Sequence, residues 1–248
     1  MREPDPSAPL SDTQRRAADA GIKMMFPVHG RPFLDYVLSA LADAGLTDVA
    51  LVVAPDHEAV RAHYTANVPA RVALSYLVQP EPHGTADAML AVESWADGHP
   101  FLAMNADNLY PVPALRALAS LDEPGLPGFE REELVRSSNI PEARILAFAL
   151  VHVDDEGYLT GIVEKPSEVH GGLISMNLWR FDSRIFSACR DVPRSARGEF
   201  ELPQAVGLAT RRGVRFRTIP ARGPVLDLSR RGDAADLERR LSGPAPRP

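Results

Sequence analysis

The sequence predicts an α/β fold in which helices flank a mixed, mostly parallel sheet. Continuous apolar runs such as Asp48–Ala54 are typical of parallel strands that are buried on both faces. These runs alternate with helical segments, and parallel strands need such crossover helices between them. With 248 residues, of which 45% are hydrophobic and 24% charged, the chain also has an ordinary globular composition.

The N-terminal half shows this alternation most clearly. Residues 1–21 are rich in proline, aspartate, serine and arginine, so we expect a loop there, with at most a helical turn over Thr13–Ala20. Apolar residues at helical spacing then alternate with strand-like apolar runs. The predicted order is a helix from Pro32 to just before Gly45, a strand at Asp48–Ala54, a helix at Asp56–Ala66, a strand at Val72–Val78, a helix at Thr85–Ala96 and a strand at Phe101–Met104.

The C-terminal half is less regular. Residues 121–143 are rich in proline, glycine and charge, and the sequence leaves open a mobile loop over the site or a variable insertion with no role. We expect one domain over residues 22–241 and a disordered tail at 242–248. The predicted elements are a helix at 113–120, a hairpin of Ile145–Val153 with Tyr158–Val163, a strand at Leu173–Phe181, helices at 183–189 and 201–212, strands at Val214–Ile219 and Val225–Leu228, and a helix at 233–241.

Charge and cysteine content exclude several classes of protein. The net charge of −6 gives no sign of a nucleic-acid or membrane surface, and no apolar run is long enough to span a membrane. The N-terminus lacks the apolar core of a signal peptide. The single cysteine, Cys189, excludes an internal disulfide, so we expect a cytoplasmic protein. The oligomeric state is open, a homo-oligomer included.

The chain has only two lysines, Lys23 and Lys165, whereas 25 of its 27 cationic residues are arginine. A lysine ammonium serves phosphate groups as a compact point charge, while arginine acts as a planar fork. We therefore expect both lysines to have specific roles. The alternative is that they are a chance remainder of a skewed composition.

A candidate site begins at Asp107, directly after the predicted strand Phe101–Met104. Ligands of open α/β sheets bind beyond the carboxyl ends of the strands, although Asn and Asp at such places also form plain turns. Two carboxylates at strand ends suit Mg²⁺ held together with substrate phosphates, and phosphoryl-type transfer asks a protein mainly for positioning and charge. The polar residues at strand ends or in bends are Lys23, Gln79, Gly84, Asp107, Glu164, Lys165, Asn177 and Asp227.

Five motifs, in order along the chain, resemble the sugar-1-phosphate nucleotidylyltransferase family. The resemblance implies a Rossmann-like fold of the nucleotide-diphospho-sugar transferase type. It also implies attack of a sugar 1-phosphate on the α-phosphorus of an NTP, with release of pyrophosphate. The motifs are Lys23–Pro32 (family pattern PKxLxPVxGxP, with Ile22 at its first proline), Gln79–Ala88 (QxxPxGTAxA), Ala106–Asn108 (GDN), Glu164–Pro166 (EKP) and Val225–Leu228 (WxDxG).

The resemblance also implies residue roles. Lys23 and Lys165 would be catalytic, Lys23 on the nucleotide phosphates and Lys165 on the sugar phosphate. Asp107 and Asp227 would hold Mg²⁺. The nucleotide would be bound by Gln79, Gly84 and Thr85, and the sugar by Glu164 and by Asn177, which stands where the family has a glycine.

One family feature has no counterpart in this sequence. The family opens with a buried strand and a GxGxR[LM] loop, and Met1 aligns just after that loop, so we expect the chain to be an N-terminally truncated gene product. The missing strand would lie mid-sheet and leave two strand edges unpaired, so the 248-residue chain is expected to be unstable or inactive.

The sequence is also compared with three other classes of protein, namely an inactive paralogue, a glycosyltransferase and an oxidoreductase. An inactive nucleotide-sugar-binding paralogue stays open, favoured by the absent loop and by Ala106 at the family's glycine. A glycosyltransferase usually has a DxD where this chain has Asn105-Ala106-Asp107. A dinucleotide oxidoreductase is disfavoured because no GxGxxG follows a strand. The base and the sugar are not identified by the sequence.

Overall fold

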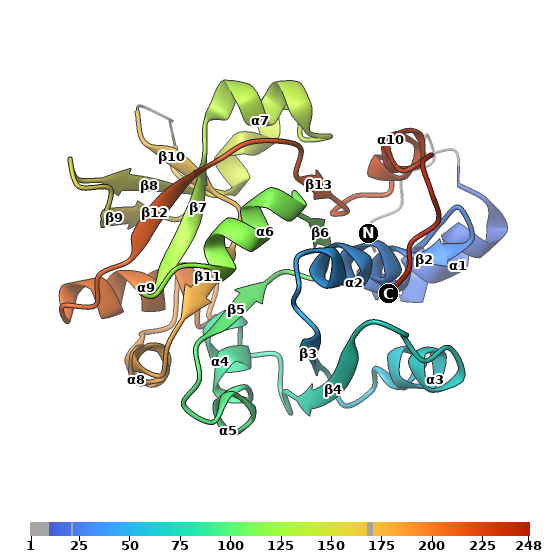
Figure 1. Ribbon diagram of the computed structural model, residues 1–248, viewed down its shortest axis with the longest axis horizontal. Coiled ribbons are helices and arrows are strands. Elements are labelled where there is room, and N and C mark those ends of the chain that lie inside the picture. The colour runs from blue at the N-terminus through green and yellow to red at the C-terminus, as the bar shows by residue number, and fades with distance from the viewer. Residues whose placement is uncertain (1–9, 21, 168–170) are drawn as a thin grey trace.

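The strands form one large sheet and three small ones within the described residues of the computed structural model, which are 10–20, 22–167 and 171–248 (Figure 1). The large sheet has seven strands in the order β5-β11-β7-β10-β8-β9, with β12 beside β7. Its members are β5 (Phe101–Met104), β7 (Gly125–Phe129), β8 (Ala149–Val153), β9 (Leu159–Val163), β10 (Leu173–Ser175), β11 (Leu178–Phe181) and β12 (Arg217–Ala221).

The three small sheets carry the segments around the site. A parallel pair consists of β3 (Asp48–Val53) and β4 (Ala73–Val78), and a short hairpin of β1 (Pro27–Val28) and β2 (Arg31–Pro32). The third is an antiparallel pair of β6 (Asn108–Leu109) and β13 (Leu226–Asp227). The last pair joins segments that are more than a hundred residues apart in the sequence, directly beside Asp107.

Helices cover both faces of the large sheet, and neighbouring residues of one strand pack into opposite cores. In β11, Leu178 belongs to the core with α2 and α6, whereas Trp179 belongs to the core with α8 and α9, as the alternation of strand side chains requires. The helices are α1 (Asp12–Ala20), η1 (Lys23–Met25), α2 (Phe33–Asp43), α3 (Glu58–Ala66), α4 (Thr85–Leu90), α5 (Glu93–Ala96), α6 (Val112–Ala119), α7 (Arg131–Ser137), η2 (Glu142–Ala147), α8 (Arg184–Asp191), α9 (Leu202–Arg211) and α10 (Asp233–Arg240).

The α/β class with a mixed sheet flanked by helices is confirmed, but the share of parallel pairing is smaller than the sequence predicts. Only the pairs β3–β4 and β7–β12 are parallel among the described strands. The other pairs of the large sheet are antiparallel. The short β8–β9 turn allows only an antiparallel pair. The other antiparallel pairs of the large sheet join strands that are not consecutive in the chain, so local sequence patterns could not predict them. No helix among the described residues is long and apolar enough to cross a membrane.

Residues 121–143 are neither a mobile loop nor an insertion, because they supply β7 and α7. All five residues of β7 are buried, and the strand lies mid-sheet with α6 packed against it (Figure 1). Its sequence, GLPGF, has the glycine and proline that strands usually avoid. A Cβ at Gly125 would lie 2.5 Å from the Arg217 carbonyl oxygen, and one at Gly128 would lie 2.5 Å from Leu173 Cδ1. The two glycines therefore permit the close approach of neighbouring chains.

Two segments near the ends of the chain, residues 12–20 and 242–248, are more ordered than the sequence predicts, while residues 1–9 and 21 of the loop expected at 1–21 lie outside the described residues. Residues 12–20 form a full helix rather than a single turn, and Ser11 and Gln14 cap it: Ser11 N–H donates to Gln14 Oε1 (3.0 Å) and Gln14 N–H to Ser11 Oγ (3.3 Å). Residues 242–248 are not a disordered tail. Arg247 N–H donates to Ser39 Oγ (3.1 Å), and Ala70 N–H donates to the Pro248 carbonyl (2.9 Å), so the C-terminus lies along α2 (Figure 1).

Two predicted elements are interrupted, and three others start late. The helix expected at Thr85–Ala96 divides into α4 and α5, and the strand expected at Leu173–Phe181 divides into β10 and β11. Asn177 causes the second break, because its φ of +57° is left-handed and ends the extended backbone. η2 occupies the start of the strand expected at residue 145, β12 begins at Arg217 rather than at residue 214, and β13 begins at Leu226.

Candidate active site

A cavity of about 1020 Å³ brings together four of the residues singled out in the sequence. Lys23 comes from η1, Asp107 from the turn after β5, Thr85 from the start of α4 and Asn177 from the break between β10 and β11. Gln79, Gly84, Glu164, Lys165 and Asp227 do not line it.

Lys23 and Asp107 form an ion pair at this cavity, with Lys23 Nζ 2.8 Å from Asp107 Oδ2. Both side chains are partly open to solvent, at 38% and 22% exposure. Exposed pairs of this kind are worth about 0–1 kcal/mol, so a phosphate can displace Asp107 from the ammonium at little cost. The pair thus combines an available cation with an available carboxylate.

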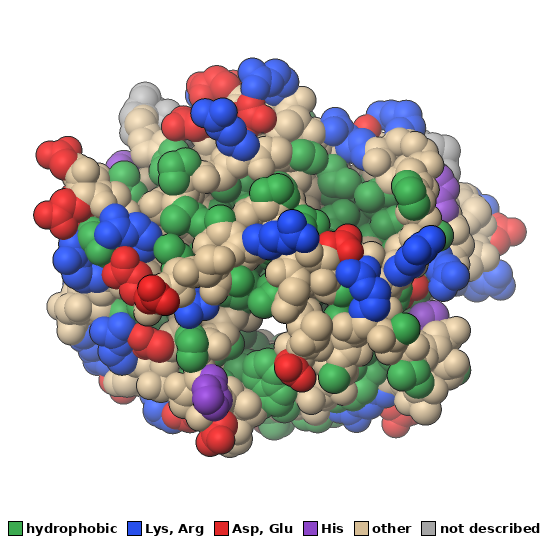
Figure 2. All heavy atoms as spheres, viewed as in Figure 1, with side chains coloured by type: hydrophobic (Ala, Val, Ile, Leu, Met, Phe, Trp, Pro, Cys, Tyr) green, Lys and Arg blue, Asp and Glu red, His purple; other side chains and the backbone are tan. Residues whose placement is uncertain are grey.

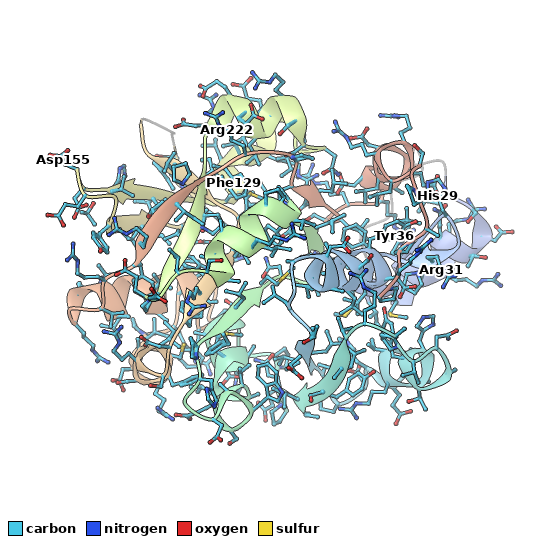
Figure 3. All side chains as sticks on the ribbon, viewed as in Figure 1. His29, Arg31, Tyr36, Phe129, Asp155 and Arg222 are labelled. Carbon is cyan, nitrogen blue, oxygen red and sulfur yellow. The ribbon has the colours of Figure 1, made fainter. Side chains whose placement is uncertain are left out.

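The hairpin after Lys23 is held in place by the helices around it. Tyr36 Oη of α2 donates to the Val28 carbonyl (3.3 Å), and His29 Nε2 lies 2.7 Å from the Glu238 carbonyl of α10. Figure 3 shows His29, Arg31 and Tyr36 close to one another at this end of the molecule. The hairpin that follows η1 is thereby fixed relative to α2 and α10.

The turn that carries Asp107 is fixed from both sides. Asn108 N–H donates to the Asn105 carbonyl (3.3 Å), which closes the turn, and Leu228 N–H donates to the Asp107 carbonyl (2.9 Å). Tyr110 Oη donates to the Met176 carbonyl (2.5 Å), and burial raises the Tyr110 pKa well above its ordinary value. Tyr110 therefore stays a neutral donor that ties the Asp107 turn to the Asn177 break.

The loop from Gln79 to Thr85 packs against the start of α9. Gln79 Nε2 donates to the Gly84 carbonyl (3.1 Å) and to Asp87 Oδ2 (2.7 Å). Gly84 has a φ of +120°, and a Cβ there would lie 2.5 Å from the Phe200 carbonyl oxygen. Leu202 N–H donates to Thr85 Oγ1 (2.9 Å), so the loop is fastened to the N-terminus of α9.

Two acceptor oxygens among the sequence-predicted residues have no hydrogen-bond partner in the described part of the chain. These are Glu164 Oε2 and Asn177 Oδ1, and both atoms are buried. Burial raises the Glu164 pKa, and Glu201 raises it further, while Lys165 and Arg197 lower it. An unsatisfied buried acceptor costs about 1–3 kcal/mol, so these oxygens are suited to receive hydroxyl donors from a ligand.

The sequence reasoning missed Glu201. Its carboxylate accepts hydrogen bonds from Arg197 Nε (3.1 Å) and Ser195 Oγ (3.1 Å), and it acts on Glu164 through its charge. Its position in the sequence could have identified it, because Glu201 stands immediately before α9, which has Pro203 in its first turn. Acidic residues at such a place are favoured by the helix dipole.

The sequence reasoning also missed Arg144, which contacts Asp227. The Arg144 side chain is 8% exposed and pairs with both Asp227 and Asp233. Asp227 Oδ2 accepts further bonds from Asn108 Nδ2 (2.9 Å) and Ser229 Oγ (3.1 Å). Arg144 lies in η2, one residue beyond the stretch 121–143 whose role the sequence left open. It is also one of 25 arginines, so nothing in the sequence marked it.

The donors present fit a hard cation at Asp107 and do not fit one at Asp227. Asp107 lines the cavity and has a partner that a phosphate can replace, whereas both oxygens of Asp227 accept bonds inside the protein and its side chain is 4% exposed. No group of three or more His, Cys, Asp or Glu that could hold a metal occurs within the described ranges.

The same cavity extends between β3 and β5 as an apolar slot. It is lined by residues 48–52 of β3 and by all of β5, and Figure 2 shows an opening with hydrophobic side chains around it in this region. Among the described strands, β3 pairs only with β4, and β5 only with β11.

Comparisons with known proteins identify the family of the chain. Residues 18–223 match the family described as Nucleotidyl transferase. The chain is 30% identical over 225 residues to a UTP–glucose-1-phosphate uridylyltransferase of Haloferax volcanii, covering 88% of this chain and 87% of that protein. It is 27% identical over 205 residues to a glucose-1-phosphate thymidylyltransferase of Mycolicibacterium smegmatis, covering 81% and 68%. A Streptomyces antibioticus glucose-1-phosphate thymidylyltransferase is 25% identical, and the chain spans 59% of its length.

Solved structures give the same fold. A UDP-glucose pyrophosphorylase in complex with UDP-glucose superposes with a TM-score of 0.72 at 17% identity, covering 89% of this chain and 90% of the other. A UDP-glucose pyrophosphorylase without ligand gives 0.71 at 18% identity, covering 88% and 91%. At these identities the likeness shows the fold alone, and the family rests on the sequence matches. By those matches, the chain belongs to the sugar-1-phosphate nucleotidylyltransferases.

Proposed function

We propose that this chain joins an NTP and a sugar 1-phosphate to form an NDP-sugar and pyrophosphate. The observation that carries the proposal is the Lys23–Asp107 pair, which presents an exchangeable cation and carboxylate at the mouth of a cavity. Phosphoryl-type transfer needs positioning and charge rather than a protein nucleophile. A lysine ammonium and a carboxylate are therefore the types of group that such a reaction uses. We place the reaction in the cytoplasm, where the single buried Cys189 stays reduced.

In the proposed reaction Lys23 leaves Asp107 and binds the nucleotide phosphates, which carry more negative charge than one carboxylate. Lys165 neutralises the attacking phosphate of the sugar. Mg²⁺, when bound, supplies further neutralisation of phosphate charge, and Asp107 would hold it together with phosphate oxygens. The chain's own contribution is then to align the attacking oxygen, the α-phosphorus and the leaving pyrophosphate.

The nucleotide is proposed to lie against the loop of Gln79, Gly84 and Thr85. Support comes from the fixed geometry of this loop, in which Gln79 is oriented by Gly84 and Asp87 and Thr85 is fastened to α9. A glycine backbone at residue 84 allows a flat ring to approach closely. The base itself is left open.

The sugar is proposed to bind at Glu164 and Asn177. Their buried oxygens without partners are acceptors for sugar hydroxyls. Burial and the charge of Glu201 raise the Glu164 pKa. Lys165 follows Glu164 directly and would bring the sugar phosphate towards the nucleotide.

The second candidate is a nucleotide-sugar-binding protein without activity. It is favoured by Asp227, whose carboxylate is fully engaged by protein donors and thus differs from an available metal ligand. A pyrophosphate-release assay over several NTPs and sugar 1-phosphates with Mg²⁺ separates the two candidates. Turnover with any pair supports the transferase, while binding of an NDP-sugar without turnover by any pair supports the second candidate.

A further inference from the structure

Asp227 is the centre of a buried polar network, here called the Arg144 network, which consists of Asn108, Arg144, Asp227, Ser229 and Asp233. Arg144 places one guanidinium nitrogen on Asp227 Oδ1 and the other 2.7 Å from Asp233 Oδ1. Asp233 Oδ2 in turn accepts the N–H groups of Ser229 (3.0 Å) and Arg230 (2.7 Å). One arginine thus joins β13 to the first turn of α10.

The acceptor capacity of Asp227 is almost used up. An ionised carboxylate offers about four lone-pair sites, and Asp227 accepts from a guanidinium, an amide and a hydroxyl. A divalent cation at Asp227 would have to displace Arg144 or Asn108. Displaced Arg144 would keep its charge in a buried place, next to Asp233 alone.

The network reaches the neighbour of Asp107. Asn108, whose amide binds Asp227, follows Asp107 in the chain, and Asn108 is also the strand partner of Asp227 across the β6–β13 pair. On the other side, the Asn139 side chain exchanges two hydrogen bonds of 2.8 Å with the backbone of Asp227. Asp227 therefore fixes the backbone from which the Asp107 side chain projects.

We propose that the Arg144 guanidinium occupies the position of a cation at Asp227, so that Asp107 is the one carboxylate of this pair that binds the divalent ion. Arg144 and Asp227 are then positioning residues for Asp107. The inference deepens the proposed function, since that function uses the ion, but it concerns metal binding and is tested without turnover.

The experiment titrates Mn²⁺ into the 248-residue chain and measures bound ion by electron paramagnetic resonance. Asp107→Asn is expected to weaken Mn²⁺ binding at least tenfold. Asp227→Asn, which keeps the shape and an acceptor, is expected to change the dissociation constant less than threefold. Asp155→Asn, at the tip of the β8–β9 turn far from the site (Figure 3), is the matched control and is expected to bind like the parent.

Arg144→Met gives the readout that a merely structural role would not produce. Removing the guanidinium frees Asp227, so Mn²⁺ binding is expected to become tighter, and Arg144→Lys is expected to restore parent affinity. If Arg144→Met does not fold, the Mn²⁺ affinities of Asp227→Asn and Asp107→Asn still test the proposal. The proposal is overturned if Asp227→Asn weakens Mn²⁺ as much as Asp107→Asn does, or if a folded Arg144→Met binds no tighter than the parent.

Failure of the proposed function is recognised separately. If the Mn²⁺ pattern is as expected and no NTP with any sugar 1-phosphate releases pyrophosphate, the inference stands and the transferase proposal fails. If pyrophosphate is released but the two aspartate variants lose Mn²⁺ equally, the transferase proposal stands and the inference fails.

Discussion

The ammonium of Lys23 lies 2.8 Å from the carboxylate of Asp107, although 84 residues separate them in the sequence. Lys23 projects from a 3-10 turn and Asp107 from the end of a sheet strand, and both face one cavity. The two groups that we propose to act near phosphate thus form an ion pair that solvent can reach.

Lys23→Met is expected to reduce kcat/KM for pyrophosphate release about 10²-fold or more, because a preorganised charge on the phosphates is lost. Stability is expected to change by less than about 1 kcal/mol, since the pair is partly exposed. Steady-state kinetics and thermal unfolding measure the two effects. Arg71→Met, which breaks the surface pair with Asp43, is the control and leaves kcat/KM unchanged. Unchanged kcat/KM in Lys23→Met would contradict the assignment.

Arg144→Met is expected to lower the free energy of unfolding by about 3–5 kcal/mol, since it leaves two buried carboxylates without their cation. Urea denaturation monitored by circular dichroism measures the change. Arg184→Met removes the exposed pair with Asp182 and is expected to cost less than about 1 kcal/mol. Equal effects of the two substitutions would show that the Arg144 network does not contribute more than a surface pair.

Gly84→Ala is expected to destabilise the chain by about 1–3 kcal/mol and to raise the KM for the NTP. Its Cβ would meet the Phe200 backbone at 2.5 Å and would also force an L-residue into a φ of +120°. Gly98→Ala separates the two causes, because Gly98 has a φ of +76° and open space around its Cβ position. A KM for the NTP that rises equally in both variants would argue against a role of the Gly84 loop in nucleotide binding.

Glu164 is expected to make stability fall as pH rises. Its pKa in the folded chain is raised above the ordinary 4.5, so between the two values the folded state binds more protons than the unfolded state. The contribution is fully present below pH 4.5 and is lost as pH rises through the folded pKa. Denaturant unfolding from pH 4 to pH 7 measures it. Glu164→Gln should lose this slope, whereas the exposed Glu132→Gln should keep it.

The slot between β3 and β5 predicts that a chain extended at its N-terminus by a six-residue apolar strand is more stable than the 248-residue chain. Unpaired buried backbone groups cost about 1–3 kcal/mol each against a total stability of about 5–15 kcal/mol. Urea denaturation of both chains measures the difference. An equal free energy of unfolding would refute this prediction.

Much of the fold could be read from local patterns. Asp48–Val53 and Phe101–Met104 are strands as predicted, because apolar runs of that length, bounded by breakers, have few other stable arrangements. β7 could not be predicted in this way. A side chain at Gly125 would clash with β12, and one at Gly128 would clash with β10. These contacts exist only after the chain has folded.

The candidate site was predicted in part. Lys23 and Asp107 were found because strand ends and rare lysines mark them, and the structure brings them into contact. The sharing of one ion by Asp107 and Asp227 was predicted from their positions at strand ends and from the family resemblance. Hydrogen-bond donors such as Arg144 cannot be assigned to Asp227 before the tertiary contacts are known. The roles of Gln79, Glu164, Lys165 and Asn177 stay predictions.

The separation of the β3–β4 pair from the large sheet affects the cleft. Gln79 follows β4 and Asp107 follows β5, so the two sides of the proposed nucleotide site are carried by different sheets. Within the described residues, no ladder of strand bonds sets the distance between them. That distance depends instead on side-chain packing and on loop contacts such as Thr85 with Leu202 and Ala86 with Phe200. The width of the cleft can therefore vary at a small cost in free energy. We expect a segment that fills the slot between β3 and β5 to fix the distance between the base and the phosphates of a bound nucleotide.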